Sequence, residues 1–153
     1  MTVAKYTFEE VVPHSSPMAL LDNIEHWDEN SLSASVTLSE KSPFASAEGV
    51  PTWIGIEYMA QAIAAFSGVK SRQQQGDVKI GLLLGSRRYS CNRELFPLNT
   101  LIVVNVEKVI GSDNGLFVFE CNIRGPNNLL ANANLNVFEP EDTDSFLQGK
   151  NND

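Results

Sequence analysis

The stretch that decides the fold is GVPTWIGIEYMAQAIAAFSG, residues 49–68. Nearly every residue from Trp53 to Phe66 is apolar or small, which predicts a helix buried on all sides. Such a helix of about 15 residues would be roughly 22 Å long, too short to cross a bilayer. Pro51 suits its first turn, and Gly68 suits its end.

Two polar side chains, Glu57 and Gln61, interrupt this helix four residues apart, so they share one helical face. A carboxylate in apolar surroundings must be paired, protonated or used in chemistry, because burying it alone is costly. We therefore interpret Glu57 as the principal functional candidate, against an alternative in which it is hydrogen-bonded at a subunit contact. Gln61 would orient Glu57 or bind a water, and plain packing is its alternative.

The composition, 42% hydrophobic residues in a chain of 153, is that of a globular protein. The formal net charge of −8 argues against nucleic acid as a partner, and no basic-then-apolar leader opens the chain, so we expect a cytoplasmic protein. Cys91 and Cys121 fall in strand-like runs and are interpreted as reduced core thiols. No metal or nucleotide motif is present, so no metal or other cofactor is expected.

Strands are predicted where apolar and polar residues alternate, in one run before the helix and four after it: 31–38, 79–91, 99–110, 116–124 and 128–138. One long helix with a series of antiparallel strands is an α+β pattern. Wrapping a curved sheet around the helix gives the hotdog architecture, whose sheet normally pairs with that of another copy, so a dimer is expected. We predict one domain over residues 1–139 and a disordered acidic tail over 140–153.

Three segments together resemble the hotdog-fold 3-hydroxyacyl-acyl-carrier-protein dehydratases: PHSSPMALLDNI (13–24), PTWIGIEYMAQA (51–62) and RRYSCNRELFPLNTLIVVNVEKV (87–109). The central helix is similar in particular to the ApeP-like dehydratases found with aryl polyene biosynthesis. The resemblance implies removal of water from a 3-hydroxyacyl thioester, in fatty acid- or polyene-type biosynthesis, with the substrate carried on a phosphopantetheine arm. It implies an acyl carrier protein as partner, and a homodimer or a heterodimer with a related hotdog subunit.

In that family a histidine of one subunit removes the α-proton, and a helix carboxylate of the other protonates the departing hydroxyl. Backbone N–H groups at the helix start bind the thioester oxygen. Glu57 and Gln61 stand at the family's acid and glutamine positions. Thr52 replaces its glycine at the helix start and keeps a backbone N–H for the thioester oxygen. Trp53 would line the acyl tunnel, although packing in the core or at an interface is its simpler interpretation. Pro43 occupies the position of the catalytic histidine.

The chain has two histidines. His14 stands at the family's N-terminal histidine and is first interpreted as a turn or cap residue, with catalysis or a substrate or partner contact as alternatives. His26 lies beside Glu25 and near Asp28, which indicates a surface residue.

Basic residues gather between positions 70 and 93, which hold six of the eleven: Lys70, Arg72, Lys79, Arg87, Arg88 and Arg93. A solvated loop and strand edge is the simplest interpretation, and a docking patch for an acidic or phosphorylated partner is the alternative. Because acyl carrier proteins are acidic, the resemblance favours Arg87, Arg88 and Arg93 for carrier docking.

Four functions follow from these observations. The first is a dehydratase half-site that contributes Glu57 while a related subunit supplies the missing histidine. The second is a self-sufficient enzyme that uses His14 as its base. The third is a hotdog acyl thioesterase, in which the helix carboxylate activates water. The fourth is a non-catalytic acyl-binding or scaffold subunit that stabilises a partner enzyme.

Overall fold

The computed structural model of the chain describes residues 2–3, 19–73, 82–111 and 114–138. His14, the first half of the segment 13–24 and the expected acidic tail lie outside these residues. No helix in the described part is long and apolar enough to cross a membrane.

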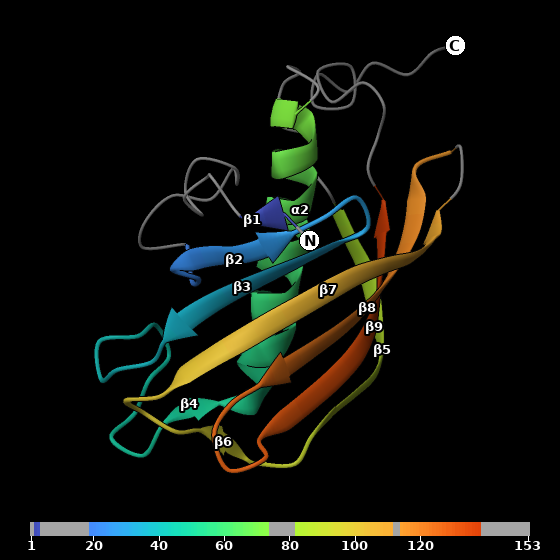
Figure 1. The fold of residues 1–153 in the computed structure, drawn as a ribbon. Coiled ribbons are helices and arrows are strands. Elements are labelled where there is room, and N and C mark those ends of the chain that lie inside the picture. The colour runs from blue at the N-terminus through green and yellow to red at the C-terminus, as the bar shows by residue number, and fades with distance from the viewer. Residues whose placement is uncertain (1, 4–18, 74–81, 112–113, 139–153) are drawn as a thin grey trace, which may run out of the picture.

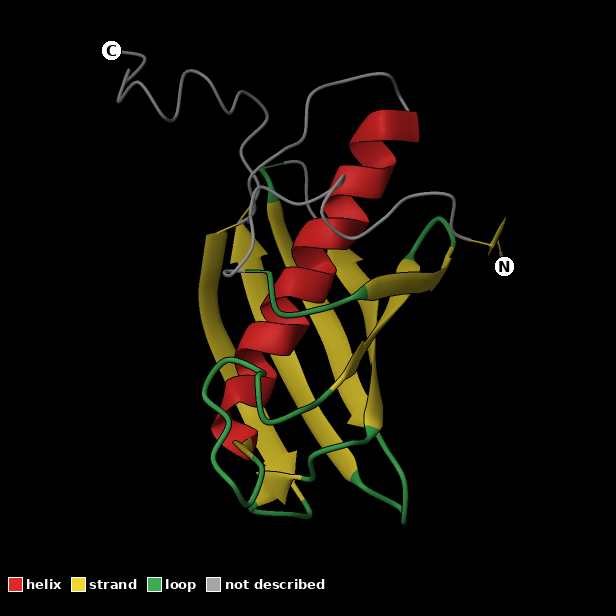
Figure 2. Cartoon of the chain, turned by 90° about the vertical axis from the view of Figure 1, so that its left-hand side faces the viewer, coloured by secondary structure: helices red, strands yellow, loops and turns green. Residues whose placement is uncertain are grey.

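The described residues form one long helix packed on one face of an antiparallel sheet (Figures 1 and 2). In chain order the elements are β1 (Thr2–Val3), β2 (Asn23–Trp27), β3 (Ser31–Thr37), β4 (Val50–Pro51), the 3-10 turn η1 (Thr52–Ile54), α2 (Gly55–Gln73), β5 (Leu82–Cys91), β6 (Leu95–Phe96), β7 (Leu101–Gly111), β8 (Leu116–Arg124) and β9 (Leu130–Phe138). The main sheet has seven strands in the order β1-β2-β3-β7-β8-β9-β5, and β4 pairs with β6 separately. This arrangement confirms the predicted α+β hotdog fold.

The core lies between α2 and the sheet. Its strand residues stand at the alternating positions that the sequence predicted to face inward. In β9, Ala131, Ala133, Leu135 and Val137 are buried while the asparagines between them face the other side. Each inward position packs beside an inward residue of β8, as in the Cys121–Ala133 pair. The small alanines leave room for α2, as expected for close helix–sheet packing.

The five predicted strands are all present, and the residues expected to face inward from 31–38, 116–124 and 128–138 are buried or half-buried. Both cysteines are free thiols, as predicted. The strand β2 and the short pair β4–β6 were not predicted, because each is too short to show an alternating pattern.

The predicted end of the helix at Gly68 is wrong. The helix α2 continues to Gln73, because Val69 and Ser71 are buried and Lys70 Nζ donates to the Glu29 carbonyl oxygen at 2.7 Å. Tertiary contacts therefore outweigh the poor helix propensity of one glycine, which is about 1 kcal/mol.

The prediction that the helix is buried on all sides is also wrong for this chain alone. The sheet covers one side of α2 (Figure 2), and the opposite side carries a stripe of exposed or half-buried residues. We call this the uncovered stripe: Trp53, Ile56, Glu57, Ala60 and Ala64. Trp53 is 65% exposed, and it ends the stripe at the start of the helix. An apolar stripe of this kind is typical of a surface that another subunit covers.

Two neighbouring positions of β9 test which face of the sheet meets the helix. Ala131→Leu should destabilise the chain by about 1–3 kcal/mol, because Ala131 is buried and the larger side chain has no space. Asn132→Leu, on the exposed face, should change the free energy of unfolding by less than about 0.5 kcal/mol. Urea unfolding measures both, and equal losses would contradict the packing described.

Candidate functional site

The start of the central helix is held in place by the short β4–β6 pair. Val50 lies opposite Phe96 and Pro51 opposite Leu95, directly before the 3-10 turn that leads into α2. Gly49 precedes this pair with φ of 146°, and a Cβ there would lie 2.6 Å from the Phe96 carbonyl oxygen. Only glycine fits this conformation and this close approach.

Thr52 links the helix start to the chain just before β6. Its N–H donates to the Glu94 carbonyl oxygen at 3.2 Å, and its hydroxyl lies 3.1 Å from the Arg93 and 3.2 Å from the Glu94 carbonyl oxygens. Its carbonyl oxygen accepts a hydrogen bond from the Tyr89 hydroxyl. The polar groups of Thr52 are therefore all engaged within the chain, including the N–H that was expected to bind the thioester oxygen.

A recess of about 630 Å³ opens beside the helix start. It is lined almost entirely by apolar side chains, apart from one carboxylate and one amide: Leu20, Pro43, Phe44, Trp53, Ile54, Glu57 and Gln61. The rings of Phe44 and Trp53 lie with centroids 6.1 Å apart at one border, and Phe44 is 61% exposed. Phe44 also has φ of 68°, an uncommon conformation for a bulky residue.

Glu57 and Gln61 face each other in this recess, as their spacing predicted. Gln61 Nε2 donates to Glu57 Oε1 at 3.3 Å, and Gln61 Oε1 accepts the Leu20 N–H at 2.8 Å. Gln61 is 1% exposed, and these two hydrogen bonds fix both ends of its amide. Glu57 is exposed on the open side of the recess. This geometry favours the interpretation in which Gln61 orients Glu57.

The enclosure expected for Glu57 is not found in the chain alone. Glu57 is exposed, because it lies on the uncovered stripe, on the side of α2 that the chain's own sheet does not cover. It nevertheless stays at the recess, beside Ile54 and Trp53 at the helix start. A second subunit on the stripe would enclose it.

This arrangement has the parts that acid catalysis on a thioester needs from one subunit. An oriented carboxylate can hold or release a proton at one defined place. The first N–H groups of a helix have no acceptor within the helix and can bind a developing negative charge. The apolar lining suits an acyl chain. Within the described residues, no group of three or more acidic, cysteine or histidine side chains could hold a metal.

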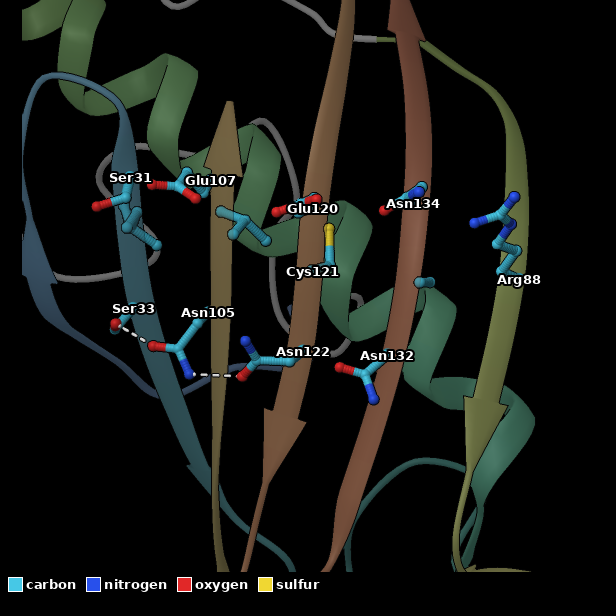
Figure 3. A pocket seen from close by; sticks show the side chains of 13 residues that line it. Ser31, Ser33, Arg88, Asn105, Glu107, Glu120, Cys121, Asn122, Asn132 and Asn134 are labelled. Atoms are coloured by element: carbon cyan, nitrogen blue, oxygen red, sulfur yellow. Dashed lines mark hydrogen bonds between the residues drawn. The ribbon is translucent and has the colours of Figure 1, made fainter. Parts of the chain in front are cut away.

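Two of the arginines predicted to bind a carrier protein, Arg88 and Arg93, do not line the recess that holds Glu57. Arg88 lies on the face of the sheet away from α2 (Figure 3), and it has φ of 58°. The guanidinium of Arg93 donates to the Asn92 and Asn127 carbonyl oxygens, at 3.0 and 2.6 Å. The side chain of Arg87 is outside what the structure describes. His26 is exposed on β2, as predicted.

A second recess, of about 530 Å³, lies on that outer face of the sheet (Figure 3). A row of polar side chains crosses it, in which the Ser33 hydroxyl donates to Asn105 and Asn105 Nδ2 donates to Asn122 Oδ1 at 2.9 Å. These groups bond to one another across strands that are neighbours in the sheet. The row therefore stabilises strand pairing, and this second recess has a more polar lining than the first and no helix start beside it.

Three contributors to the site were not predicted from sequence: the Leu20 N–H, the Phe44 ring and the Tyr89 hydroxyl. Leu20 lies in an apolar run before β2, and nothing in that run indicates its partner on α2. Phe44 follows directly after Pro43, at the position of the missing histidine, and this adjacency was the available signal. Nothing in the sequence indicated the contact made by Tyr89.

The fold and the recess define a class, the hotdog proteins, and solved structures agree. A hypothetical thioesterase from Streptococcus pneumoniae, solved with coenzyme A, has a TM-score of 0.61 at 12% identity and covers 76% of this chain and 84% of its own. A Streptococcus mutans protein bound to acetyl coenzyme A has a TM-score of 0.59 at 12% identity, covering 82% and 95%. At such identities the likeness concerns the fold alone.

Within this class the chain belongs to the ApeP-like family, described as ApeP dehydratase, whose family profile matches residues 6–148. A chain of the ApeI:P dehydratase heterocomplex from Xenorhabdus doucetiae is similar with a TM-score of 0.84 and 25% identity, covering 97% of this chain and all of its own. No curated protein matches the chain. The family resemblance read from the sequence is thus confirmed.

The position of Gln61 can be tested by its effect on stability. Gln61→Leu should destabilise the chain by about 1–3 kcal/mol, because the buried Leu20 N–H would lose its acceptor. Gln73→Leu, at the exposed end of the same helix, should have an effect below about 0.5 kcal/mol. Chemical unfolding measures both variants. An unchanged free energy of unfolding in Gln61→Leu would contradict the hydrogen bond from the Leu20 N–H to Gln61.

Proposed function

We propose that this chain contributes the acid half of a 3-hydroxyacyl-acyl-carrier-protein dehydratase site, which it shares with a related hotdog subunit. The observation that carries the proposal is Glu57, oriented by Gln61 at an apolar recess whose usual base position is occupied by Pro43. Family membership supports the dehydratase class, and the heterocomplex of the similar Xenorhabdus doucetiae structure supports a hetero-assembly. The reaction would serve fatty acid- or polyene-type synthesis.

In the proposed reaction a base of the partner subunit removes the α-proton of the thioester. The electron pair forms the double bond as the bond between C3 and the hydroxyl breaks, and Glu57 gives its proton to the departing oxygen, so that water leaves. The negative charge that builds on the thioester oxygen is stabilised by N–H groups at the start of the helix. The base then returns its proton to Glu57 through solvent.

The remaining residues of the recess would bind the acyl chain and exclude water. Trp53, Phe44 and Leu20 present apolar surface beside Glu57. Because Thr52 uses its own N–H and hydroxyl within the chain, its contribution would be to hold the turn from which the next N–H groups emerge. Pro43 offers no proton acceptor, so the base comes from the partner or, in the alternative, from His14.

The uncovered stripe also favours a shared site. Glu57 lies among apolar residues that the described part of the chain leaves exposed or half-buried, and a partner seated there would bury them together with the acyl group. The alternative of a scaffold subunit uses the same stripe without Glu57. The two therefore differ in one measurable property, the role of the carboxylate.

Replacement of the carboxylate by an amide distinguishes these roles. In the complex with the partner subunit, Glu57→Gln should lower kcat for dehydration of a 3-hydroxyacyl-carrier protein by about 100-fold or more, because the amide cannot donate the proton. Glu48→Gln, exposed in the loop before β4, is the matched control and should keep full turnover. Product is measured as the unsaturated acyl thioester.

Each other outcome of this experiment selects a different function. Unchanged turnover by Glu57→Gln would favour the scaffold. Activity of the lone chain that disappears in His14→Ala would favour a self-sufficient enzyme. Release of free thiol, followed with a thiol reagent, would identify a thioesterase instead of a dehydratase.

We also propose that Arg87 and Arg88 attract the acidic carrier protein, with Arg93 holding the neighbouring turn and adding charge. Arg87→Glu together with Arg88→Glu should raise KM for the carrier-bound substrate at least tenfold, more at low than at high salt. The free acyl-pantetheine is the internal control and should be affected much less. Equal losses for both substrates would indicate misfolding and contradict carrier docking.

A further inference from the structure

Tyr89 contacts the start of the helix from an edge strand of the main sheet. It lies in β5, the last strand of the main sheet, and its hydroxyl donates to the Thr52 carbonyl oxygen in the 3-10 turn before α2. The same carbonyl oxygen also accepts the Gly55 N–H. Two donors therefore hold one peptide group, at the point where the chain becomes helical.

A β-bulge accompanies this contact. The register of β5 against β9 shifts between Arg87 and Ser90, so that two residues of β5 lie opposite the single Ala133. One of the two, Arg88, has φ of 58°, a conformation that side chains other than those of glycine, asparagine and aspartate rarely adopt. Bulges re-aim the side chains beside them, and the re-aimed residue here is Tyr89.

The glycine at position 55, the first residue of α2, leaves room for the Tyr89 hydroxyl. A Cβ at Gly55 would overlap the Tyr89 hydroxyl, and it would also lie 3.1 Å from Ile123 Cδ1. Gly55 is buried and has helical φ and ψ, so its glycine is explained by space and not by an unusual backbone conformation. Gly55 and Tyr89 thus fit each other as a pair.

Burial also keeps the Tyr89 hydroxyl in the form that donates. Desolvation raises the pKa of Tyr89 above its usual range, and the nearby Cys91 and Tyr58 raise it further. Because the phenol stays protonated up to strongly alkaline pH, the bond to the Thr52 carbonyl oxygen is present throughout the range in which an enzyme would work.

We infer that Tyr89 is a positioning residue, which directs the N–H groups of the helix start toward the thioester oxygen in the recess. The inference rests on the proposed function, because that oxygen is the group the N–H donors would meet. Rotation of the Thr52 peptide would turn the N–H groups of the next residues, Trp53 and Ile54, and both of these residues line the recess. The Tyr89 hydroxyl opposes that rotation.

The test compares two ligands that differ in the thioester oxygen. Butyryl-pantetheine has the carbonyl, and S-butyl-pantetheine, a thioether, lacks it. Wild-type protein should bind the thioester more tightly, and Tyr89→Phe should reduce this preference by about fivefold, the effect of one ordinary hydrogen bond. Binding of the thioether should not change. Tyr58→Phe, which removes a hydroxyl from the buried side of α2, should keep the wild-type preference.

Turnover by the complex provides the second measurement. Tyr89→Phe should lower kcat about tenfold with KM nearly unchanged, because a misdirected donor weakens the transition state more than the ground state. Gly55→Ala should lower kcat by a smaller factor in the Tyr89→Phe background than in the wild type, because the hydroxyl that the added methyl group would overlap is absent. Thermal unfolding of each variant checks that the fold is intact.

The outcomes separate this inference from the proposed function. If the wild-type protein shows no preference for the thioester and its complex dehydrates no acyl thioester, the proposed function is overturned and this inference with it. If wild-type protein shows both and Tyr89→Phe retains them in full, Tyr89 does not position the donors. If Tyr89→Phe lost affinity equally for both ligands, Tyr89 would be a structural residue only, and this result would also overturn the inference.

Discussion

The structure depends on one packing constraint: a single sheet can cover only one side of a helix that is apolar almost all round. The side of α2 that carries Tyr58, Met59 and Phe66 is buried against the strands. Within the described residues, the stripe that includes Trp53 and Glu57 stays exposed or half-buried. Burial of such a stripe by a partner would remove its apolar area from water. The same apolar helix thus provides the core and leaves a surface that a second subunit would cover.

Much of the fold was readable from sequence because β-strands repeat every two residues and the repeats here are long. The runs at 116–124 and 128–138 place their inward-facing residues at every second position, and both became strands within two residues of the predicted bounds. The end of the helix was misjudged at Gly68, because burial of Val69 is a tertiary effect that local propensity does not contain. The exposure of Glu57 was missed for a related reason: an apolar pattern says that a face is buried, but not by which chain.

The residues of the site also fall into two groups, those that local sequence predicted and those that it did not. Glu57 and Gln61 were predicted from helical spacing, a local property, and they meet in the structure. The Leu20 N–H is separated from Gln61 by 41 residues and the Tyr89 hydroxyl from Thr52 by 37, so neither contact leaves a trace in the sequence nearby. Backbone groups are the least visible contributors, since any residue provides them. The arginines clustered in sequence, yet Arg88 faces the outer side of the sheet and Arg93 holds a turn.

Both ends of the recess are held by contacts from distant strands and loops, which is why a carboxylate exposed in the single chain still has a defined direction. Gln61 bonds to Glu57 on one side and to the backbone at Leu20 on the other, while the Thr52 peptide is held by Tyr89 and by Gly55. A group that must give up a proton at one place benefits from such pre-organisation, since no ordering is left for the moment of reaction. What this chain lacks is a proton acceptor at Pro43. A subunit that covers the uncovered stripe would stand where an acceptor is missing, so apolar burial and completion of the site would require the same contact.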